Sequence, residues 1–459
     1  MHSPGYRSTI IIAMVVVYLA LTAWLTARSR STTSSEFMVG ARSLSPLVVG
    51  VLMASEFVGT KSMIGTAQAA FESGMAASWA VLSVAIGFPV FGLVLARRLY
   101  NSGEYTISGA IFQRYGRPTQ LIVSVIMIYA LLLVNVGNYM SGAAVVGAAL
   151  HLDLPLAAFA IALVSTFYVA LGGMKSVARV TIWHSVMKIL GVAVVLCVAL
   201  RLTGGVAPMR AALPALYFTW DGAIGASTIV AFFIGNLGAI FSTQYIMQAI
   251  SSTTSADGAM RSTFVAGALA LPLGVALGLI GVAARVLYPH VPSLYALPMF
   301  LGEMDDILAG FVTVALVASI FAGVSTVALA IASLVVRDFY IPFWQPAPER
   351  QLQVTRWIAI AIGFVPLAFV FLAPGLLTLS FFTRALRLSI SVVAVIGLYL
   401  PFFGSGRGAA CGLLAAVATT TAWYLLGNPY GIDNMYIALV TPALVIAVER
   451  VFDRHWVPR

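Results

Sequence analysis

LSPLVVGVLMASEFVGTKSMIGTAQAA, residues 44–70, is the most informative segment of the sequence, because it is long enough to cross a bilayer yet carries Glu56 and Lys61 near its middle. A charge at the centre of a membrane helix costs about 2.5–3.5 kcal/mol, so such residues normally face a bundle interior or a water-filled cavity. The glycines and hydroxyl side chains around them permit a break in the helix. We therefore expect a discontinuous helix that lines a solute or ion site. The alternative is that both charges only hold neighbouring helices together.

The composition restricts the class of protein. The chain has 459 residues, of which 61% are hydrophobic and 9% charged, and its mean hydropathy is +1.00. These values indicate a polytopic membrane protein that contacts the lipid bilayer and no nucleic acid, despite the net charge of +10. Cys197 and Cys411 lie in apolar runs, and neither a Walker loop nor a Cys/His ligand pattern is present. We expect neither an enzyme nor a metal or organic cofactor.

The apolar runs predict an all-α fold of about thirteen transmembrane helices. They lie near 8–27, 44–70, 76–98, 118–149, 154–172, 179–201, 223–249, 260–287, 307–336, 354–373, 375–403, 408–426 and 434–451. The loops on one side of the membrane carry most of the basic residues, whereas those on the other carry only Arg7, Arg201, Arg210 and Arg285. Because cytoplasmic loops retain Lys and Arg, this asymmetry predicts an external N-terminus and a cytoplasmic C-terminus in a bacterial inner membrane.

Several polar residues inside apolar runs are candidates for a solute site. Arg384 and Arg387 lie one turn apart and share a helix face, where guanidinium groups suit a carboxylate or phosphate. Lys188 has a long stem that can reach the interface or bond to carbonyls, and we favour a structural role for it. The amide of Asn236 either lines a cavity or clamps helices together. The substrate-binding candidates are Glu56, Lys61, Ser62, Asn236, Arg384 and Arg387.

Four segments, in order, resemble the sodium:solute symporter family. They are SSEFMVGARSLSPLVVGVLMASEFVGTKSMIGTAQAAFESG, VALGGMKSVARVTIWHSVMK, FSTQYIMQAISS and LVASIFAGVSTVALAIASLVVRDFY, which together span residues 34–340. The resemblance implies the leucine-transporter-type architecture, in which two inverted five-helix repeats begin with helices broken at the bilayer midplane. The implied breaks are at 55–59 and 235–238. The implied divisions are 1–43 for an extra N-terminal helix and loop, 44–205 and 206–403 for the repeats, and 404–459 for two C-terminal helices and a tail.

The resemblance also implies where a sodium ion would bind, and there this chain departs from the family pattern. Family members hold sodium between carbonyls of the first broken helix, a hydroxyl pair on the eighth core helix and an Asp on the fifth. An ungapped match puts Ala322 and Gly323 at the hydroxyl pair and Thr181 at the Asp. Hard cations need several oxygen ligands, so the site is altered. The cation site or its replacement comprises Ser55, Val58, Lys61, Thr181, Ser319, Ala322, Gly323 and Thr326.

These departures favour proton coupling through Lys61 or Glu56, or sodium independence. An ammonium group tethered at the vacated site can hold the same helices together, and its deprotonation would release them. A three-residue deletion after Thr326 would instead return the hydroxyls of Ser325 and Thr326 to a sodium site, and would leave an ordinary sodium-coupled symporter. We therefore expect a secondary transporter of a small polar solute, an organic anion or amino acid, that works by alternating access. The remaining alternative is a transporter-like solute sensor, and neither the solute nor the oligomeric state follows from the sequence.

Overall fold

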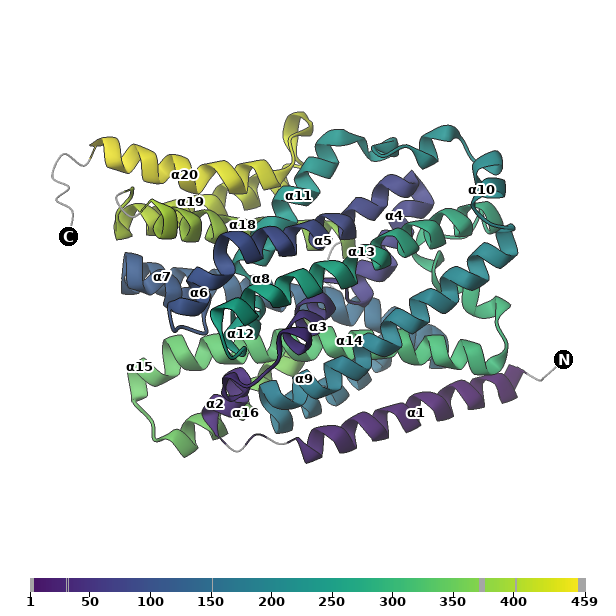
Figure 1. The fold of residues 1–459 in the computed structure, drawn as a ribbon, viewed down its shortest axis with the longest axis horizontal. Helices are drawn as coiled ribbons and strands as arrows, with labels where there is room; N and C mark the ends of the chain where they lie inside the picture. Colours follow the sequence, from purple (N-terminus) through teal and green to yellow (C-terminus); the bar gives the residue numbers. More distant parts are fainter. Residues whose placement is uncertain are drawn as a thin grey trace.

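The computed structural model describes residues 4–29, 31, 33–150, 152–370, 376–400 and 403–452. These residues form a bundle of helices, most of which run roughly along one direction (Figure 1). The helices are α1 (Pro4–Arg28), α2 (Ser34–Val39), α3 (Pro46–Phe57), α4 (Thr60–Ser73), α5 (Trp79–Phe91), α6 (Arg97–Asn101), α7 (Ile107–Tyr115), α8 (Arg117–Leu150), α9 (Leu154–Thr203), α10 (Val206–Ala212), α11 (Gly225–Ser242), α12 (Gln244–Ser251), α13 (Ala256–Leu287), α14 (Asp306–Leu334), α15 (Ile341–Trp344), α16 (Pro348–Phe364), α17 (Leu367–Val370), α18 (Leu376–Tyr399), α19 (Gly406–Leu425) and α20 (Asn434–Phe452). Short 3-10 segments and the two π-helical turns at Gly92–Ala96 and Val335–Tyr340 connect or extend some of them.

The number of membrane spans agrees with the expectation from the sequence. Within the described residues, 11 helical segments are long and apolar enough to cross a membrane, and the bent pair α3–α4 makes up to 12. A shorter apolar segment, Leu154–Phe167, forms the first part of α9. The all-α, polytopic fold class is thus confirmed. The predicted start of one span at residue 375 and the tail after Phe452 lie outside the described residues.

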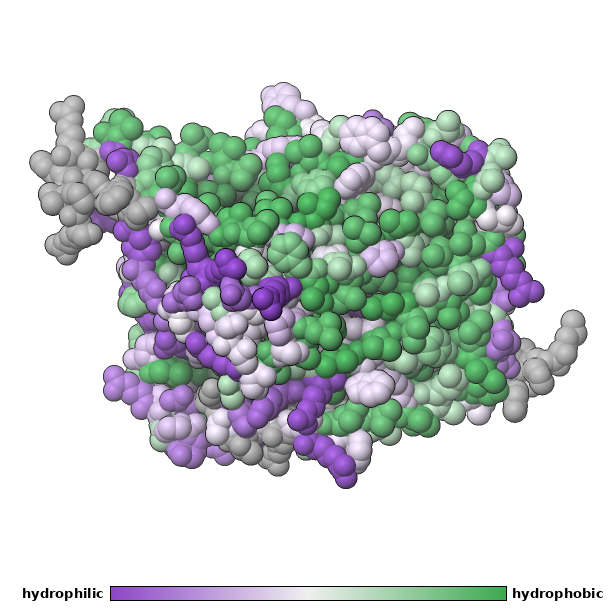
Figure 2. Space-filling model, in the orientation of Figure 1, coloured by the Kyte–Doolittle hydropathy of each residue, from purple (hydrophilic) through white to green (hydrophobic). Residues whose placement is uncertain are grey.

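The two ends of the bundle differ in charge. One end carries α2, α6, α7, α12 and α15 (Figure 1), and we call it the arginine-rich end because Arg42, Arg98, Arg114, Arg117 and Arg337 lie on or beside these helices. The opposite end carries the start of α1 and α10 (Figure 1). Figure 2 shows hydrophilic side chains gathered at the arginine-rich end and an apolar surface between the two ends. This apolar band fits a protein that crosses a bilayer.

The first predicted break is present. Ser45 caps α3 by accepting a hydrogen bond from the backbone N–H of Val48, and Pro46 occupies the first helical turn. The helix ends at Phe57, Gly59 is extended, and α4 starts at Thr60 after a bend of 53°. The break therefore lies within the expected interval of 55–59.

The second predicted break is displaced. Gly235 and Gly238 are both helical within α11, and the chain leaves the helix only at Thr243, which has the extended dihedral angles φ −60° and ψ 125°. A Cβ atom at Gly238 would lie 2.9 Å from the Cα atom of Leu388, so this glycine allows α18 to approach closely. The expectation of a break at 235–238 is wrong because the glycines there serve packing.

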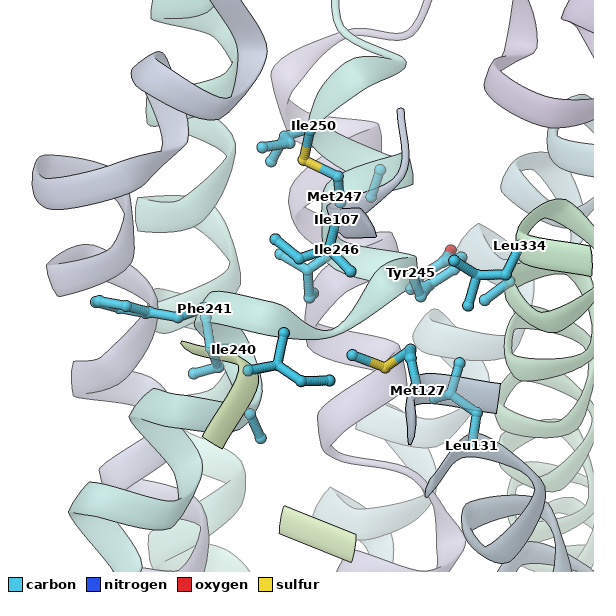
Figure 3. Close-up of a cluster of buried hydrophobic side chains, with 14 of the residues drawn as sticks. Ile107, Met127, Leu131, Ile240, Phe241, Tyr245, Ile246, Met247, Ile250 and Leu334 are labelled. Carbon is cyan, nitrogen blue, oxygen red and sulfur yellow. The ribbon is translucent and has the colours of Figure 1, made fainter. Parts of the chain in front are cut away.

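Apolar side chains surround the second break. Figure 3 shows Ile240 and Phe241 before Thr243, and Tyr245, Ile246 and Met247 after it. Side chains of α7, α8 and α14 meet them there, and all belong to one buried cluster. The irregular backbone is thus buried in protein, which is where non-helical backbone is tolerated at membrane depth.

Polar contacts close the arginine-rich end. Asp338 is fully buried and accepts hydrogen bonds from Ser108 Oγ and Ser124 Oγ, each at 2.5 Å, and from Gln120 Nε2 at 2.9 Å. Lys175 Nζ lies 2.6 Å from a carboxylate oxygen of Glu36, which joins α9 to α2. The contacts of Asp338 join α7 and α8 to the segment after α14, and the Lys175–Glu36 pair joins α9 to α2, so both sets hold helices together at this end.

Candidate functional site

Lys188 occupies the break of the first helix. Its Nζ donates to the carbonyl of Val58 at 2.9 Å and to Ser55 Oγ at 3.1 Å, and the side chain is only 2% exposed. The Ser55 hydroxyl also lies 2.6 Å from Ser185 Oγ on the same helix as Lys188. A carbonyl at a helix end lacks an intrahelical partner, so the Val58 carbonyl is available to a cation. The ammonium group of Lys188 binds it.

This contact changes the role expected for two lysines. The sequence suggested Lys61 as the replacement for sodium and only a structural role for Lys188. In the structure, Lys188 from α9 contacts the Ser55 hydroxyl and the Val58 carbonyl, whereas Lys61 lines a separate cavity. Lys188 does not reach the membrane interface, because its side chain is buried beside the break.

That cavity brings together most of the predicted substrate residues. It has a volume of about 40 Å³ and lies between the α3–α4 break, α8 and α18. Glu56, Lys61, Ser62, Arg384 and Arg387 all contribute to its lining. The full set is Glu56, Phe57, Gly59, Lys61, Ser62, Val134, Asn138, Arg384 and Arg387.

Asn236 does not join this cavity. Its Nδ2 donates to the carbonyl of Ala80 at 3.1 Å and to Ser83 Oγ at 2.7 Å, and the side chain is fully buried. It therefore clamps α11 to α5. Asn138 does line the cavity, and its Nδ2 lies 3.2 Å from Asn135 Oδ1.

Neighbouring helices fix two of the charged groups. Thr326 Oγ1 on α14 donates a short hydrogen bond to Glu56 Oε2. The guanidinium of Arg387 donates from one terminal nitrogen to Thr243 Oγ1 at 2.9 Å and from Nε to the carbonyl of Thr383 at 3.1 Å. Arg387 thus links the cavity to the second helix break. Sequence reasoning missed Thr243, although it stands in the FSTQYIMQ segment that carried part of the family resemblance.

The residues assigned to the altered cation site lie in different places. Thr181 and Ala322 line a small cavity between α1, α9 and α14, and Ser325 also belongs to it. Ser319 Oγ lies 3.7 Å from the sulfur of Met63, and Gly323 offers its carbonyl to Thr326 at 2.9 Å.

Hydroxyl groups, not carboxylates, provide the polar lining of this small cavity beside His184. Its nine lining residues are Thr26, Ser176, Val177, Val180, Thr181, His184, Phe321, Ala322 and Ser325. Thr26 Oγ1, Ser176 Oγ and Ser325 Oγ make no hydrogen bond with the described residues. The His184 ring is fixed by a 2.6 Å hydrogen bond between Nδ1 and the hydroxyl of Tyr18, in agreement with a structural role.

The described residues contain no group of three or more His, Cys, Asp or Glu side chains that could hold a metal ion. The arrangement instead offers a broken helix, a buried ammonium group at the break and a charged cavity beside it. Broken helices around a central polar site are the feature by which transporters alternate access across a membrane.

Comparison with known proteins identifies the same class. The model of the sodium:solute symporter family matches residues 37–415. The osmoregulated proline transporter OpuE of Bacillus subtilis is 26% identical over 378 residues, which cover 77% of this chain and 75% of that protein. The human sodium/iodide cotransporter is 24% identical over 193 residues, which cover 42% of this chain and 30% of that protein.

Solved structures share the fold. A sodium-coupled sialic acid symporter in a substrate-bound, outward-open state has a TM-score of 0.84 at 17% identity, with 98% of both chains covered. A nucleobase-cation-symport-1 family transporter in a closed conformation has a TM-score of 0.61 at 15% identity, with 91% of this chain and 95% of that chain covered. The fold and the family match define a secondary solute transporter rather than an enzyme. The chain belongs to the sodium:solute symporter family.

Proposed function

We propose that this protein is a proton-coupled, sodium-independent transporter of a small organic anion or amino acid in a bacterial cytoplasmic membrane. The observation that carries the proposal is the position of Lys188 Nζ, 2.9 Å from the Val58 carbonyl at the first helix break. The family resemblance assigns sodium to the carbonyls of this break. A fixed ammonium group there supplies the same positive charge without an ion from solution.

A sodium ion bound at the Val58 carbonyl would be repelled by the charged ammonium group of Lys188. Two unit charges 4 Å apart repel by about 4 kcal/mol at an effective dielectric constant of 20. Sodium at the Val58 carbonyl would therefore require Lys188 to move or to lose its proton. Coupling to protons follows from the same contact, because a proton leaving Nζ removes the positive charge that joins α9 to α3.

The second candidate is ordinary sodium coupling. It is favoured by the family itself and by the hydroxyls of Thr26, Ser176 and Ser325, which have no hydrogen-bond partner among the described residues. Hard cations need several oxygen ligands, and the family pattern includes an Asp among the sodium ligands. The nine residues that line the small cavity carry no carboxylate, so we favour the proton.

Uptake into proteoliposomes separates the two candidates. Radiolabelled succinate, glutamate and proline are each offered under an inward proton gradient with choline as the only monovalent cation, and again under an inward sodium gradient at equal pH. We expect at least one of these solutes to accumulate under the proton gradient alone. Strict dependence of all uptake on sodium would overturn the proposal.

The Lys188→Met variant tests the assigned group. It keeps the length of the side chain and removes the ammonium. Accumulation driven by a proton gradient should be lost, whereas exchange of labelled for unlabelled solute across the membrane should continue, because exchange requires no net proton movement. Proton-driven accumulation at the wild-type rate in this variant would exclude Lys188 as the coupling group. Arg350→Gln, an exposed substitution on α16, serves as the control.

A further inference from the structure

We propose that the solute is a small dicarboxylate that binds as a dianion between α4 and α18. This inference rests on the proposed function, since it names the substrate class of the transporter. It begins with the charges that line the 40 Å³ cavity, which are three basic side chains, Lys61, Arg384 and Arg387, and one carboxylate, Glu56.

Lys61 offers an ammonium group to a ligand in this cavity. Its side chain lines the cavity beside the break, and no acceptor among the described residues lies within hydrogen-bond distance of its Nζ. A buried ammonium group normally has a partner, because an isolated charge away from water is strongly disfavoured. Glu56 does not supply one, since its carboxylate is hydrogen-bonded by Thr326 and forms no ion pair with Lys61 within 4 Å. A carboxylate of the solute fits this position.

Arg387 offers a guanidinium group whose orientation the protein fixes. Its contacts with Thr243 and Thr383 use Nε and one terminal nitrogen. The second terminal nitrogen has no hydrogen bond with the described residues, although the guanidinium lines the cavity. Thr243 and Thr383 thus fix the guanidinium group of Arg387 and leave its second terminal nitrogen for a ligand in the cavity. A guanidinium held in one orientation recognises a carboxylate with defined geometry, because its donors form a rigid fork.

The charges of the side chains that line the cavity indicate how many negative charges the solute carries. Guanidinium groups keep their protons in proteins, so with charged Lys61 the four ionisable groups sum to two positive charges. A monoanion leaves one of these charges uncompensated in a buried site. A dianion with one carboxylate at Lys61 and the other toward Arg387 compensates both, and the ammonium of an acidic amino acid would restore an excess positive charge.

The size of the cavity limits the solute to a short carbon skeleton. One buried water needs about 10–15 Å³ of such space, so the present cavity holds only a few water molecules. Even a short dicarboxylate is larger than this space, so Lys61 and Ser62, which are half-buried, must move to admit it. A sugar acid would need much larger rearrangement.

Ligand-induced thermal stabilisation of the purified full-length protein tests the assignment. The probes are succinate, succinamate, butyrate and aspartate in sodium-free buffer; succinamate has the same length as succinate but one neutral amide. A ligand that binds only the folded state raises its melting temperature by mass action. We expect succinate to bind roughly tenfold or more tightly than succinamate, with butyrate and aspartate weaker still. Equal or stronger stabilisation by succinamate, butyrate or aspartate, or no stabilisation by succinate, would overturn the dianion assignment.

Two variants show whether the named side chains cause this preference. In Lys61→Met the preference for succinate over succinamate should fall to about twofold or less, because the second carboxylate loses its partner. Arg384→Gln should also weaken succinate much more than succinamate, because it removes one of the cavity's positive charges that a dianion compensates, and Arg350→Gln should change neither. A tenfold preference that persists in both cavity variants would overturn the assignment. The uptake assay in proteoliposomes, with and without sodium, tests proton coupling. A negative result there would overturn the proposed function, whereas the binding assay described here tests only the solute class.

Discussion

The ammonium group of Lys188 joins three structural features at one point. It contacts the last carbonyl before the turn at Gly59, it contacts the hydroxyl of Ser55, and it is anchored on α9, which also carries Ser185. A charged donor to a carbonyl or hydroxyl contributes about 1.5–3 kcal/mol, more than a neutral hydrogen bond. The contact of Lys188 with the Val58 carbonyl holds the broken helix, and we propose that loss of this same contact releases it.

Reversing the charge at this position should create a sodium requirement. In Lys188→Glu a carboxylate would face the Val58 carbonyl, and two oxygen acceptors without a cation repel one another. Sodium would then find the oxygen ligands that hard cations need. We expect sodium to raise the melting temperature of Lys188→Glu by several degrees more than choline does, and to leave the wild type unchanged.

The control for this prediction is Lys175→Glu, which changes the same residue type at the arginine-rich end, where Lys175 pairs with Glu36. A sodium response of equal size in the wild type, or in the Lys175 variant, would show that the effect is not specific to the helix break. Melting curves in sodium, potassium and choline chlorides supply the comparison.

The residues of the charged cavity were predicted correctly from the sequence, whereas the lysine at the helix break was not. Glu56, Lys61, Arg384 and Arg387 stood out because charges are rare inside apolar runs, and the structure places all of them around one cavity. The choice between Lys61 and Lys188 depended on which face of each helix points to the break. Lys188 lies seven residues, or about two helical turns, after Thr181 and therefore on the same face. This spacing could have indicated from the sequence that Lys188, and not Lys61, faces the helix break.

At the scale of a helix, the position of the second break depends on packing that a single segment does not contain. Two closely spaced glycines such as Gly235 and Gly238 are typical of a helix break. Here they instead leave room for Met435 and Leu388, which pack closely against α11. Thr243 ends the helix instead, and its hydroxyl accepts from Arg387 on α18. Because Arg387 lies 144 residues further along the chain than Thr243, no local pattern in α11 identifies Thr243 as the break.

Removing this hydroxyl should weaken the link between the second break and the cavity. In Thr243→Val, Arg387 loses the acceptor for one terminal nitrogen, and a hydrogen bond to a charged group contributes about 1.5–3 kcal/mol to the free energy of unfolding. We expect a lower melting temperature and weaker stabilisation by succinate. The matched control is Thr313→Val on α14, because the hydroxyl of Thr313 bonds only to the carbonyl of Ala309, at 2.8 Å in its own helix. Equal losses in both variants would contradict a specific role for Thr243.

For the molecule as a whole, hydropathy predicted about thirteen spans, and the described residues contain 11 or up to 12 of spanning length plus the shorter apolar segment Leu154–Phe167. The agreement is close because the bilayer sets the length of each apolar run. The inverted-repeat boundaries at 44–205 and 206–403 stay predictions. The uneven distribution of arginines is now visible in three dimensions, with hydrophilic side chains gathered at one end (Figure 2). This distribution determines the orientation that we predict for the protein in the membrane.

The positive-inside rule places the arginine-rich end in the cytoplasm, because basic residues near membrane spans are retained there. Single cysteines test this orientation in a background where Cys197 and Cys411 are replaced by serine. Ala347→Cys lies between α15 and α16 at the arginine-rich end, and Ala212→Cys ends α10 at the opposite end; both positions are exposed. In intact cells a membrane-impermeant maleimide should label Ala212→Cys at once and Ala347→Cys only after permeabilisation. The reverse pattern would invert the orientation and would put the contacts of Asp338 on the external side.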